Sequence, residues 1–207
     1  MHIWFYISLF GFIAIMLPYF LSLEHLKLEE KHGKEEGKKI GEIYGMISGW
    51  GFFLFWLGIW LSPQDRFIIP VFQGFSIQIP ISSLTMYLAN VLVFLPFFTV
   101  GAWLGIKGVI HTSLKVAETH KTERIVATGV YSIVRHPQYL GGILAHIGIS
   151  FLLSGMYSLL ATPLIIALIY TISRKEENEL TKEFGQEYTD YKKKVPMLIP
   201  AVYHHKE

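Results

Sequence analysis

Five apolar stretches, separated by polar segments, dominate the pattern of the chain. They cover residues 3–23, 43–61, 84–106, 140–154 and 159–173. A helix needs about 20 residues to cross the hydrocarbon core of a bilayer, so the first three are long enough to span a membrane. The last two have 15 residues each and only four residues between them, which predicts a short helical hairpin. We therefore predict an all-α membrane bundle of five transmembrane helices and expect no sheet.

The composition agrees with this pattern. Of the 207 residues, 52% are hydrophobic, 15% are aromatic and only 16% are charged. The first stretch has no basic flank and no small-x-small cleavage site, so we expect a retained anchor and not a cleaved signal. The chain has no cysteine, which excludes disulfides, thiolate nucleophiles and cysteine-ligated metals, and we predict no metal site. We expect one domain, with residues 1–106 as a three-helix membrane scaffold and residues 107–207 as a catalytic half that binds a cofactor.

The basic residues indicate an orientation. All 18 Lys and Arg lie outside the apolar stretches: five in 24–42, five in 107–139, seven from 174 onward, and Arg66 alone in 62–83. The positive-inside rule places the three basic segments in the cytoplasm. Five crossings then put the N-terminus outside, and the active site and a helical C-terminal tail on the cytoplasmic side. The net charge of +2, with acids interleaved among the bases, argues against a nucleic-acid partner.

Prolines and glycines mark the connections and the helix contacts. The 62–83 segment is apolar and broken by prolines, which predicts an interfacial cap on the outer side, with a short hairpin as the alternative. Gly101 and Gly105 form a small-residue stripe that lets helix backbones approach closely in lipid. Gly185 is expected to end a helix, after which a second short helix runs over 186–194.

The segment 129–142, GVYSIVRHPQYLGG, is polar and lies directly before the fourth apolar stretch. A proline is well tolerated in the first turn of a helix, so we predict that a helix starts at Pro137 or Gln138. The free N–H groups at such a start favour a carboxylate or a phosphate. His146 lies seven residues after Tyr139 on the same helical face. It is either a hydrogen-bonded core histidine or part of the same cavity.

The segment after the fifth stretch carries acids beside an apolar face. Leu180 and Phe184 recur at helical spacing, and Glu176 and Glu177 lie one turn before Leu180. A carboxylate at the edge of an apolar face is costly unless it has a cationic partner. The alternative is an amphipathic surface helix with solvated acids, and spacing alone does not decide between the two.

Two strings together carry a resemblance to a known family. TGVYSIVRHPQYLGG and, about 35 residues later, RKEENELTKEFGQEYTDYKKKVP resemble the isoprenylcysteine carboxyl methyltransferase and phospholipid methyltransferase superfamily of integral membrane enzymes. The resemblance covers residues 118–200, and it implies a methyltransferase that uses S-adenosylmethionine. Carried over by position, it implies the cofactor-binding residues Ile125, Val126, Tyr131, His136, Pro137, Gln138, Tyr139 and Glu176.

The catalytic candidates and the acceptor follow from the same resemblance. In members that esterify prenylcysteine, a histidine and an arginine stand where this chain has Glu123 and Ile172. A shifted register brings Arg174 to the arginine's place. The acceptor therefore stays open between an isoprenylcysteine carboxylate and a phospholipid amine or other amphiphile from the membrane. An amine must first lose a proton, for which Glu177 and His146 are candidates, and Arg135 is expected to shape the pocket.

Two other functions remain open at this point. Membrane sterol reductases also resemble this chain in the RHPxY-type loop and the VPxxxxP ending, which would imply NADPH in a comparable pocket. A structural or transport protein would bind neither cofactor. It would line a path through the membrane with polar side chains, for which the apolar stretches offer only Asn90 and His146.

Overall fold

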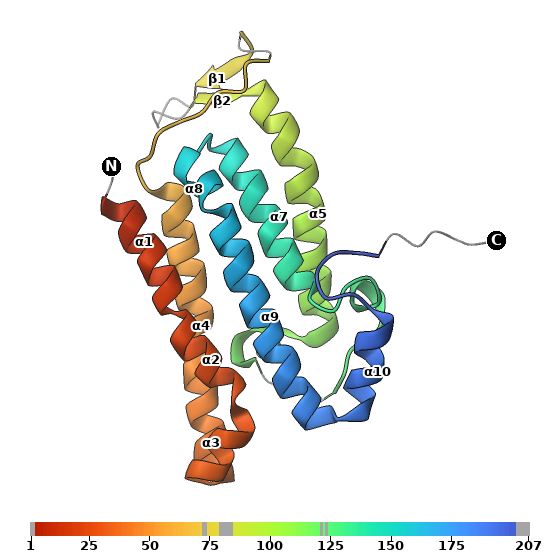
Figure 1. The fold of residues 1–207 in the computed structure, drawn as a ribbon. Helices are drawn as coiled ribbons and strands as arrows, with labels where there is room; N and C mark the ends of the chain where they lie inside the picture. Colours follow the sequence, from red (N-terminus) through yellow and green to blue (C-terminus); the bar gives the residue numbers. More distant parts are fainter. Residues whose placement is uncertain (1–2, 72–73, 79–84, 121, 123, 202–207) are drawn as a thin grey trace, which may run out of the picture.

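The computed structural model describes residues 3–71, 74–78, 85–120, 122 and 124–201. It is mostly helical, as predicted, and its long helices lie side by side (Figure 1). The stretches Ile3–Leu23, Lys34–Leu61 and Leu88–Thr112 are long and apolar enough to cross a membrane. They correspond to the first three predicted spans, whereas the two further crossings stay a prediction.

The first two spans form a pair whose outer surfaces are apolar. Helices α1 (Ile3–Ala14) and α2 (Met16–Leu23) pack along α4 (Lys34–Leu61), and the short α3 (His25–His32) turns the chain between them. Phe12 and Ile59 are fully buried in the core of this pair, together with Ile165 from later in the chain. Large apolar side chains remain exposed on the outer faces, as expected for helices that face lipid.

Glycines allow a close contact between two long helices. Helix α5 (Leu88–Thr112) lies against α7 (Pro137–Leu152), as Figure 1 shows. A Cβ atom added to Gly101 would lie 2.7 Å from the carbonyl oxygen of Gly141, and one added to Gly141 would lie 2.6 Å from that of Gly101. Side chains at these positions would therefore separate the two helices. The predicted packing role is confirmed for Gly101, whereas a Cβ atom added to Gly105 would meet no atom within 4 Å.

One end of the molecule carries a small sheet, so the expectation of no sheet was wrong. Strands β1 (Ser76–Gln78) and β2 (Thr85–Tyr87) pair in antiparallel fashion, and α5 begins at Leu88 instead of residue 84. Prolines and a glycine interrupt the segment before α5, so a helix cannot continue through it. Pairing of the two extended strands satisfies backbone groups that would otherwise lack hydrogen-bond partners. The chain between the last two apolar stretches forms the short α8 (Met156–Leu160).

The opposite end gathers the polar helices, including α3 and α10 (Gln186–Lys194) (Figure 1). Helix α7 begins at Pro137, as predicted. Helix α9 (Thr162–Phe184) carries both the fifth apolar stretch and the acids, and it ends at Gly185, whose φ of +59° suits glycine. The predicted helix stop at Gly185 and the second helix after it are confirmed. The short α6 (Leu114–Thr119) follows α5 at this end.

Candidate active site

The loop before α7 is held by the segment that follows α10. It includes a 3-10 turn, η1 (Gly129–Ser132), followed by a turn at Ile133 and a bend at Arg135 before Pro137. The backbone N–H of Arg135 donates to the carbonyl oxygen of Pro196 at 2.9 Å, and that of His136 donates to Met197 at 3.1 Å. The two sequence strings that carried the resemblance therefore meet in space through their backbones.

Arg135 and Glu177 form a buried ion pair beneath this loop. Arg135 Nε lies 2.6 Å from Glu177 Oε1, and the two side chains are only 9% and 5% exposed. The guanidinium also donates to the carbonyl oxygens of Lys192 and Val195, which ties α10 to the loop. Burial alone would raise the pKa of Glu177, but hydrogen bonds from His136 and Arg135 outweigh it and hold that pKa below 4.5. Glu177 is therefore a charged structural partner.

His136 lies between two neighbouring carboxylates. Its Nε2 is 3.3 Å from Glu177 Oε1, and its Nδ1 is 3.6 Å from Glu176 Oε2. The buried imidazole stacks on the ring of Tyr139, with ring centres 5.3 Å apart and an angle of 10° between the planes. Consecutive acids on one helix thus meet the same histidine from two directions.

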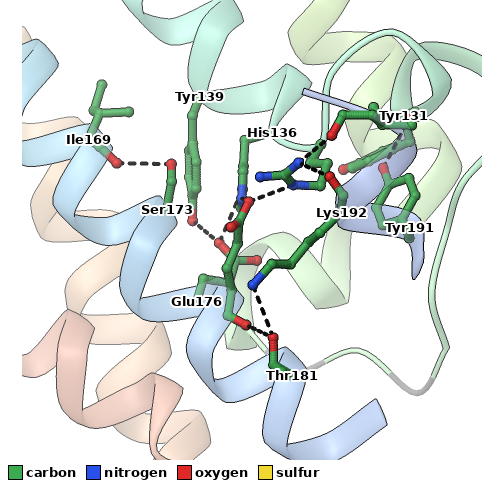
Figure 2. Close-up of polar contacts among 12 residues, drawn as sticks. Tyr131, His136, Tyr139, Ile169, Ser173, Glu176, Thr181, Tyr191 and Lys192 are labelled. Atoms are coloured by element: carbon green, nitrogen blue, oxygen red, sulfur yellow. Dashed lines mark hydrogen bonds and ion pairs between the residues drawn. The ribbon is translucent and has the colours of Figure 1, made fainter. Parts of the chain in front are cut away.

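Tyr139 joins α7 to α9 through Glu176 (Figure 2). Its hydroxyl donates to Glu176 Oε2 at 2.8 Å, and the hydroxyl of Tyr19 from α2 lies 2.6 Å away on the other side. The contacts of Glu176 fall on Oε2, and within the described part of the chain Oε1 has no polar partner. This leaves one carboxylate oxygen for a ligand.

A cavity of about 480 Å³ opens beside these residues. Most of the cofactor-binding residues implied by the resemblance line it: Ile125, Val126, Tyr131, His136, Gln138, Tyr139 and Glu176. Arg135 lines it as well, whereas Pro137 is buried beneath. On the other side the lining comes from α4, with Met46, Trp50 and Phe53 among its residues. One cavity thus combines a polar wall with an apolar wall.

Gln138 fixes the position of a second tyrosine in this cavity. Its amide nitrogen donates to Tyr131 Oη at 3.0 Å and to Thr112 Oγ1 at 3.1 Å. Burial raises the pKa of Tyr131, so this phenol stays neutral at physiological pH. The Tyr131 ring is therefore held by α5 and α7 together.

Three of the four catalytic candidates do not line the cavity. Glu177 is occupied by Arg135, as described above, and Arg174 is exposed on α9. Ile172, at the position of the family arginine, is fully buried against α2. Arg174 lies one turn before Glu177 on α9 and does not line the cavity from this position. Glu123 lies outside the described residues.

His146 is the core histidine of the two alternatives. The indole N–H groups of Trp56 and Trp60 each donate to its Nδ1 at 2.9 Å. Nδ1 must then be unprotonated, so Nε2–H donates to the carbonyl oxygen of Ser158, 3.0 Å away. Both ring nitrogens are used, and His146 is fully buried and does not line the cavity. It has no lone pair available for a substrate proton.

Sequence reasoning missed several residues at the cavity. Tyr19 lies in an apolar stretch, where a tyrosine is unremarkable, and His120 lies in a polar connection with no motif. The aromatic side chains of α4 carry no chemical signal either. Whether such a side chain faces the cavity or the lipid depends on the helical face that it occupies, and therefore on how α2 and α4 are rotated in the bundle.

Comparisons with known proteins agree with the resemblance. The family model described as phospholipid methyltransferase matches residues 84–187. The protein-S-isoprenylcysteine O-methyltransferase of Schizosaccharomyces pombe is 31% identical over 96 residues, which cover 46% of this chain and 41% of that protein. The methanethiol S-methyltransferase 2 of Bradyrhizobium diazoefficiens is 37% identical over 76 residues, covering 36% of this chain and 28% of that protein.

A longer match comes from yeast. The protein-S-isoprenylcysteine O-methyltransferase of Saccharomyces cerevisiae is 32% identical over 141 residues, or 67% of this chain and 58% of that protein. The chain thus spans less than two thirds of the length of each of these three relatives. The family model, in contrast, matches half of the chain and includes the RHPxY loop and both acids. The chain therefore belongs to the phospholipid methyltransferase family.

Proposed function

We propose that the protein is a membrane-embedded methyltransferase that uses S-adenosylmethionine and acts on a lipid or lipid-modified acceptor. The observation that carries this proposal is the Tyr139–Glu176 contact at a cavity with one polar and one apolar wall. A soluble cofactor and an amphiphilic acceptor need opposite surroundings, and this cavity offers both. Membership of the family supports an enzyme of this class.

The cavity fits the cofactor in size and in chemistry. Its volume of about 480 Å³ lies in the range of about 300–1,000 Å³ that is usual for small-molecule sites. A sulfonium and an ammonium are cations, which suit Glu176 Oε1 and the faces of Tyr131 and Tyr139. Ile125 and Val126 offer backbone and apolar contacts to an adenine. Bound there, S-adenosylmethionine would supply an electrophilic methyl group.

The start of α7 suits the carboxylate of the cofactor. Pro137 has no N–H, and the N–H of Leu140 donates to the carbonyl oxygen of His136. The N–H groups of Gln138 and Tyr139 have no partner within the described part of the chain and lie at the positive end of the helix dipole. Two free donors at this position favour an anionic group.

The apolar wall suits the acceptor chain. Trp50 and Phe53 line the cavity and are also 69% and 68% exposed within a membrane-spanning helix, so they face lipid and cavity alike. An acceptor chain held there would present its head group toward Tyr139. A carboxylate acceptor needs no base. An amine must present its lone pair, and the apolar wall favours that uncharged form because burial of a charge is costly.

Transfer then depends on position more than on acid–base catalysis. An in-line displacement at a methyl group needs the nucleophile close, aligned and partly stripped of water. Arg135 and Glu177 contribute by locking the loop that carries His136 against α9. We assign them a positioning role and assign His146 and Arg174 no role at this site.

The test of this function starts with Glu176→Gln. We expect it to weaken S-adenosylmethionine binding by at least tenfold in calorimetry on detergent-solubilised protein, whereas Glu187→Gln, at an exposed position on α10, leaves binding unchanged. Equal binding by Glu176→Gln and the wild type would refute the assignment. Mass spectrometry after incubation with labelled cofactor then identifies the acceptor: a gain of one methyl on prenylcysteine peptides or on amine phospholipids separates the two classes.

We further propose that α7 and α9 are the fourth and fifth crossings, with the N-terminus outside and the cavity on the cytoplasmic side. The distribution of basic residues supports this orientation. Because the chain has no cysteine, single cysteines at Arg66 and at Lys193 can be labelled without a background. An impermeant maleimide on intact cells should label the first and spare the second. The opposite result would reverse the orientation.

A further inference from the structure

The cofactor cavity receives a hydroxyl from outside the matched part of the chain. Tyr19 lies on α2, whereas the family model begins at residue 84. Its side chain is buried and lines the cavity, and its hydroxyl lies 2.6 Å from that of Tyr139. The role of this contact depends on which of the two hydroxyls is the donor.

The direction of the hydrogen bonds is fixed by Glu176. A charged carboxylate only accepts hydrogen bonds, so the single hydroxyl hydrogen of Tyr139 points to Glu176 Oε2. The hydroxyl of Tyr139 must then accept from Tyr19. The result is a one-way chain in which Tyr19 donates to Tyr139 and Tyr139 donates to Glu176. Hydrogen bonds in such a chain polarise and strengthen one another.

The ring of Tyr19 is held by His120, which follows α6. The two rings stack with centres 4.0 Å apart and an angle of 24° between their planes. Ser22 donates its hydroxyl hydrogen to the carbonyl oxygen of Tyr19 at 2.7 Å, so its oxygen accepts from His120 Nδ1, 2.8 Å away. His25 donates through Nε2 to the carbonyl oxygen of His120 at 3.3 Å. Ser22 of α2 and His25 of α3 therefore both hold His120, which lies in the connection after α5.

His120 has a backbone conformation that suits this arrangement. Its φ is +57°, the left-handed conformation that ends α6, and its N–H donates to the carbonyl oxygen of Val116 at 2.8 Å. Ile125 and Val126, on the adenine side of the proposed site, follow five and six residues later in the sequence. His120 also lines the cavity. It thus links the hydrogen-bond chain to the wall that faces the cofactor.

We infer that Tyr19 is a positioning residue for cofactor binding: held by His120 and Ser22, it orients the hydroxyl of Tyr139 and so fixes the Glu176 carboxylate with Oε1 toward the bound cation. This inference rests on the proposed cofactor site. It assigns a functional part to α2, which was expected to be scaffold. The tested quantity is cofactor affinity, because Tyr19 acts through Tyr139 and Glu176.

The test is a double-mutant cycle measured by calorimetry with S-adenosylmethionine on the full-length protein. Tyr19→Phe keeps the ring and its stack on His120 but removes the donor. We expect it to weaken binding about three- to tenfold in the wild-type background and less than twofold in Glu176→Gln. Tyr170→Phe, at an exposed position on α9, should leave binding unchanged. The unfolding temperature without ligand is measured for every variant.

Each outcome has one reading. Wild-type affinity in Tyr19→Phe, or an equal loss in both backgrounds, would overturn the inference while leaving the proposed function intact. Absence of binding by the wild type would instead remove the proposed function and the inference together. If Tyr19→Phe does not fold, Ser22→Ala replaces it, since this change releases His120 and leaves the side chain of Tyr19 in place. We then expect a loss of about twofold, and unchanged affinity would overturn the inference.

Discussion

Two histidines along one stretch of the chain have opposite surroundings. His136 precedes α7 and lies between the carboxylates of Glu176 and Glu177 at the edge of a cavity. His146 lies in the middle of α7, fully buried, with two tryptophan N–H groups on one nitrogen and a carbonyl oxygen on the other. His136 therefore contacts charged groups and can be reached by a ligand. His146 contacts neutral groups and cannot be reached from the cavity.

The difference shows how a membrane helix uses polar side chains. Where no water is present, a polar group must find its partners within the protein, and the partners of His146 leave nothing unsatisfied. At the polar end of the same helix, His136 shares its carboxylates with Arg135 and Tyr139, and one oxygen of Glu176 is left for a ligand. A saturated network gives stability, whereas an incomplete one gives a binding site.

The largest effect is expected from the ion pair that supports His136. Arg135→Met leaves the Glu177 carboxylate buried without its guanidinium partner. We expect a loss of about 3–5 kcal/mol in the free energy of unfolding, because removing one partner of a buried pair leaves an uncompensated charge. Denaturant unfolding in detergent measures it. Arg174→Met, at an exposed position, is the matched control and should change stability by less than about 0.5 kcal/mol.

The second prediction concerns His146, whose ring nitrogens both have protein partners. His146→Leu leaves the N–H groups of Trp56 and Trp60 and the carbonyl oxygen of Ser158 without their partner. We expect a loss of about 2–4 kcal/mol in unfolding free energy, with cofactor affinity within twofold of wild type in the folded fraction. His32→Leu, at the exposed end of α3, is the control. A large loss of affinity with intact stability would erase the contrast between the two histidines.

The third prediction concerns His136, where we expect the opposite result: a loss of cofactor affinity with a smaller loss of stability. His136→Phe keeps a ring that can stack on Tyr139 but removes both nitrogens that face Glu176 and Glu177. We expect cofactor affinity to fall about tenfold, because the carboxylates lose the group that orients them. Calorimetry measures affinity, and unfolding measured in parallel should change less than in Arg135→Met. A change in stability alone would mean that His136 resembles His146.

Much of the fold followed from the sequence because its signals are local. Apolar length identified the first three spans, Pro137 located the start of α7, and Gly185 located the end of α9. The two-stranded sheet was missed because three-residue strands produce no recognisable alternation. Helix α9 continues through its polar half, because the composition changes there while the helix geometry does not.

The site was predictable only where a motif carried it. The resemblance named Tyr139 and Glu176 for the cofactor and left Glu177 as a candidate base, but it did not show that Glu177 pairs with Arg135. Consecutive helical residues differ by about 100° in direction. That rotation sends Glu176 to the cavity and Glu177 to Arg135. Tyr19 depends on contact between stretches 120 residues apart, which no local pattern encodes.

The smallest expected effect comes from a third histidine, His120, which is intermediate between the other two because it is partly buried and lines the cavity. Burial, with a smaller contribution from nearby His25, lowers the pKa of His120 to about 3, against 6.5 for an unperturbed histidine. In the unfolded chain it takes up a proton as the pH falls below about 6.5, whereas in the folded protein it does not until about pH 3. The stabilising contribution of neutral His120 is therefore complete above pH 6.5 and is lost as the pH falls toward 3.

We accordingly expect the protein to lose about 1 kcal/mol of stability through His120 between pH 7 and pH 5, a figure reduced for the partial exposure of the ring. His120→Phe keeps a ring that can stack on Tyr19 but cannot titrate, so its unfolding temperature should fall less over this interval than that of the wild type. His32→Phe, which changes an exposed histidine, should retain the full wild-type dependence. If the unfolding temperatures of the wild type and His120→Phe changed in parallel with pH, His120 would exchange protons as freely as a surface histidine. The packed contact with Tyr19 would then not persist in solution.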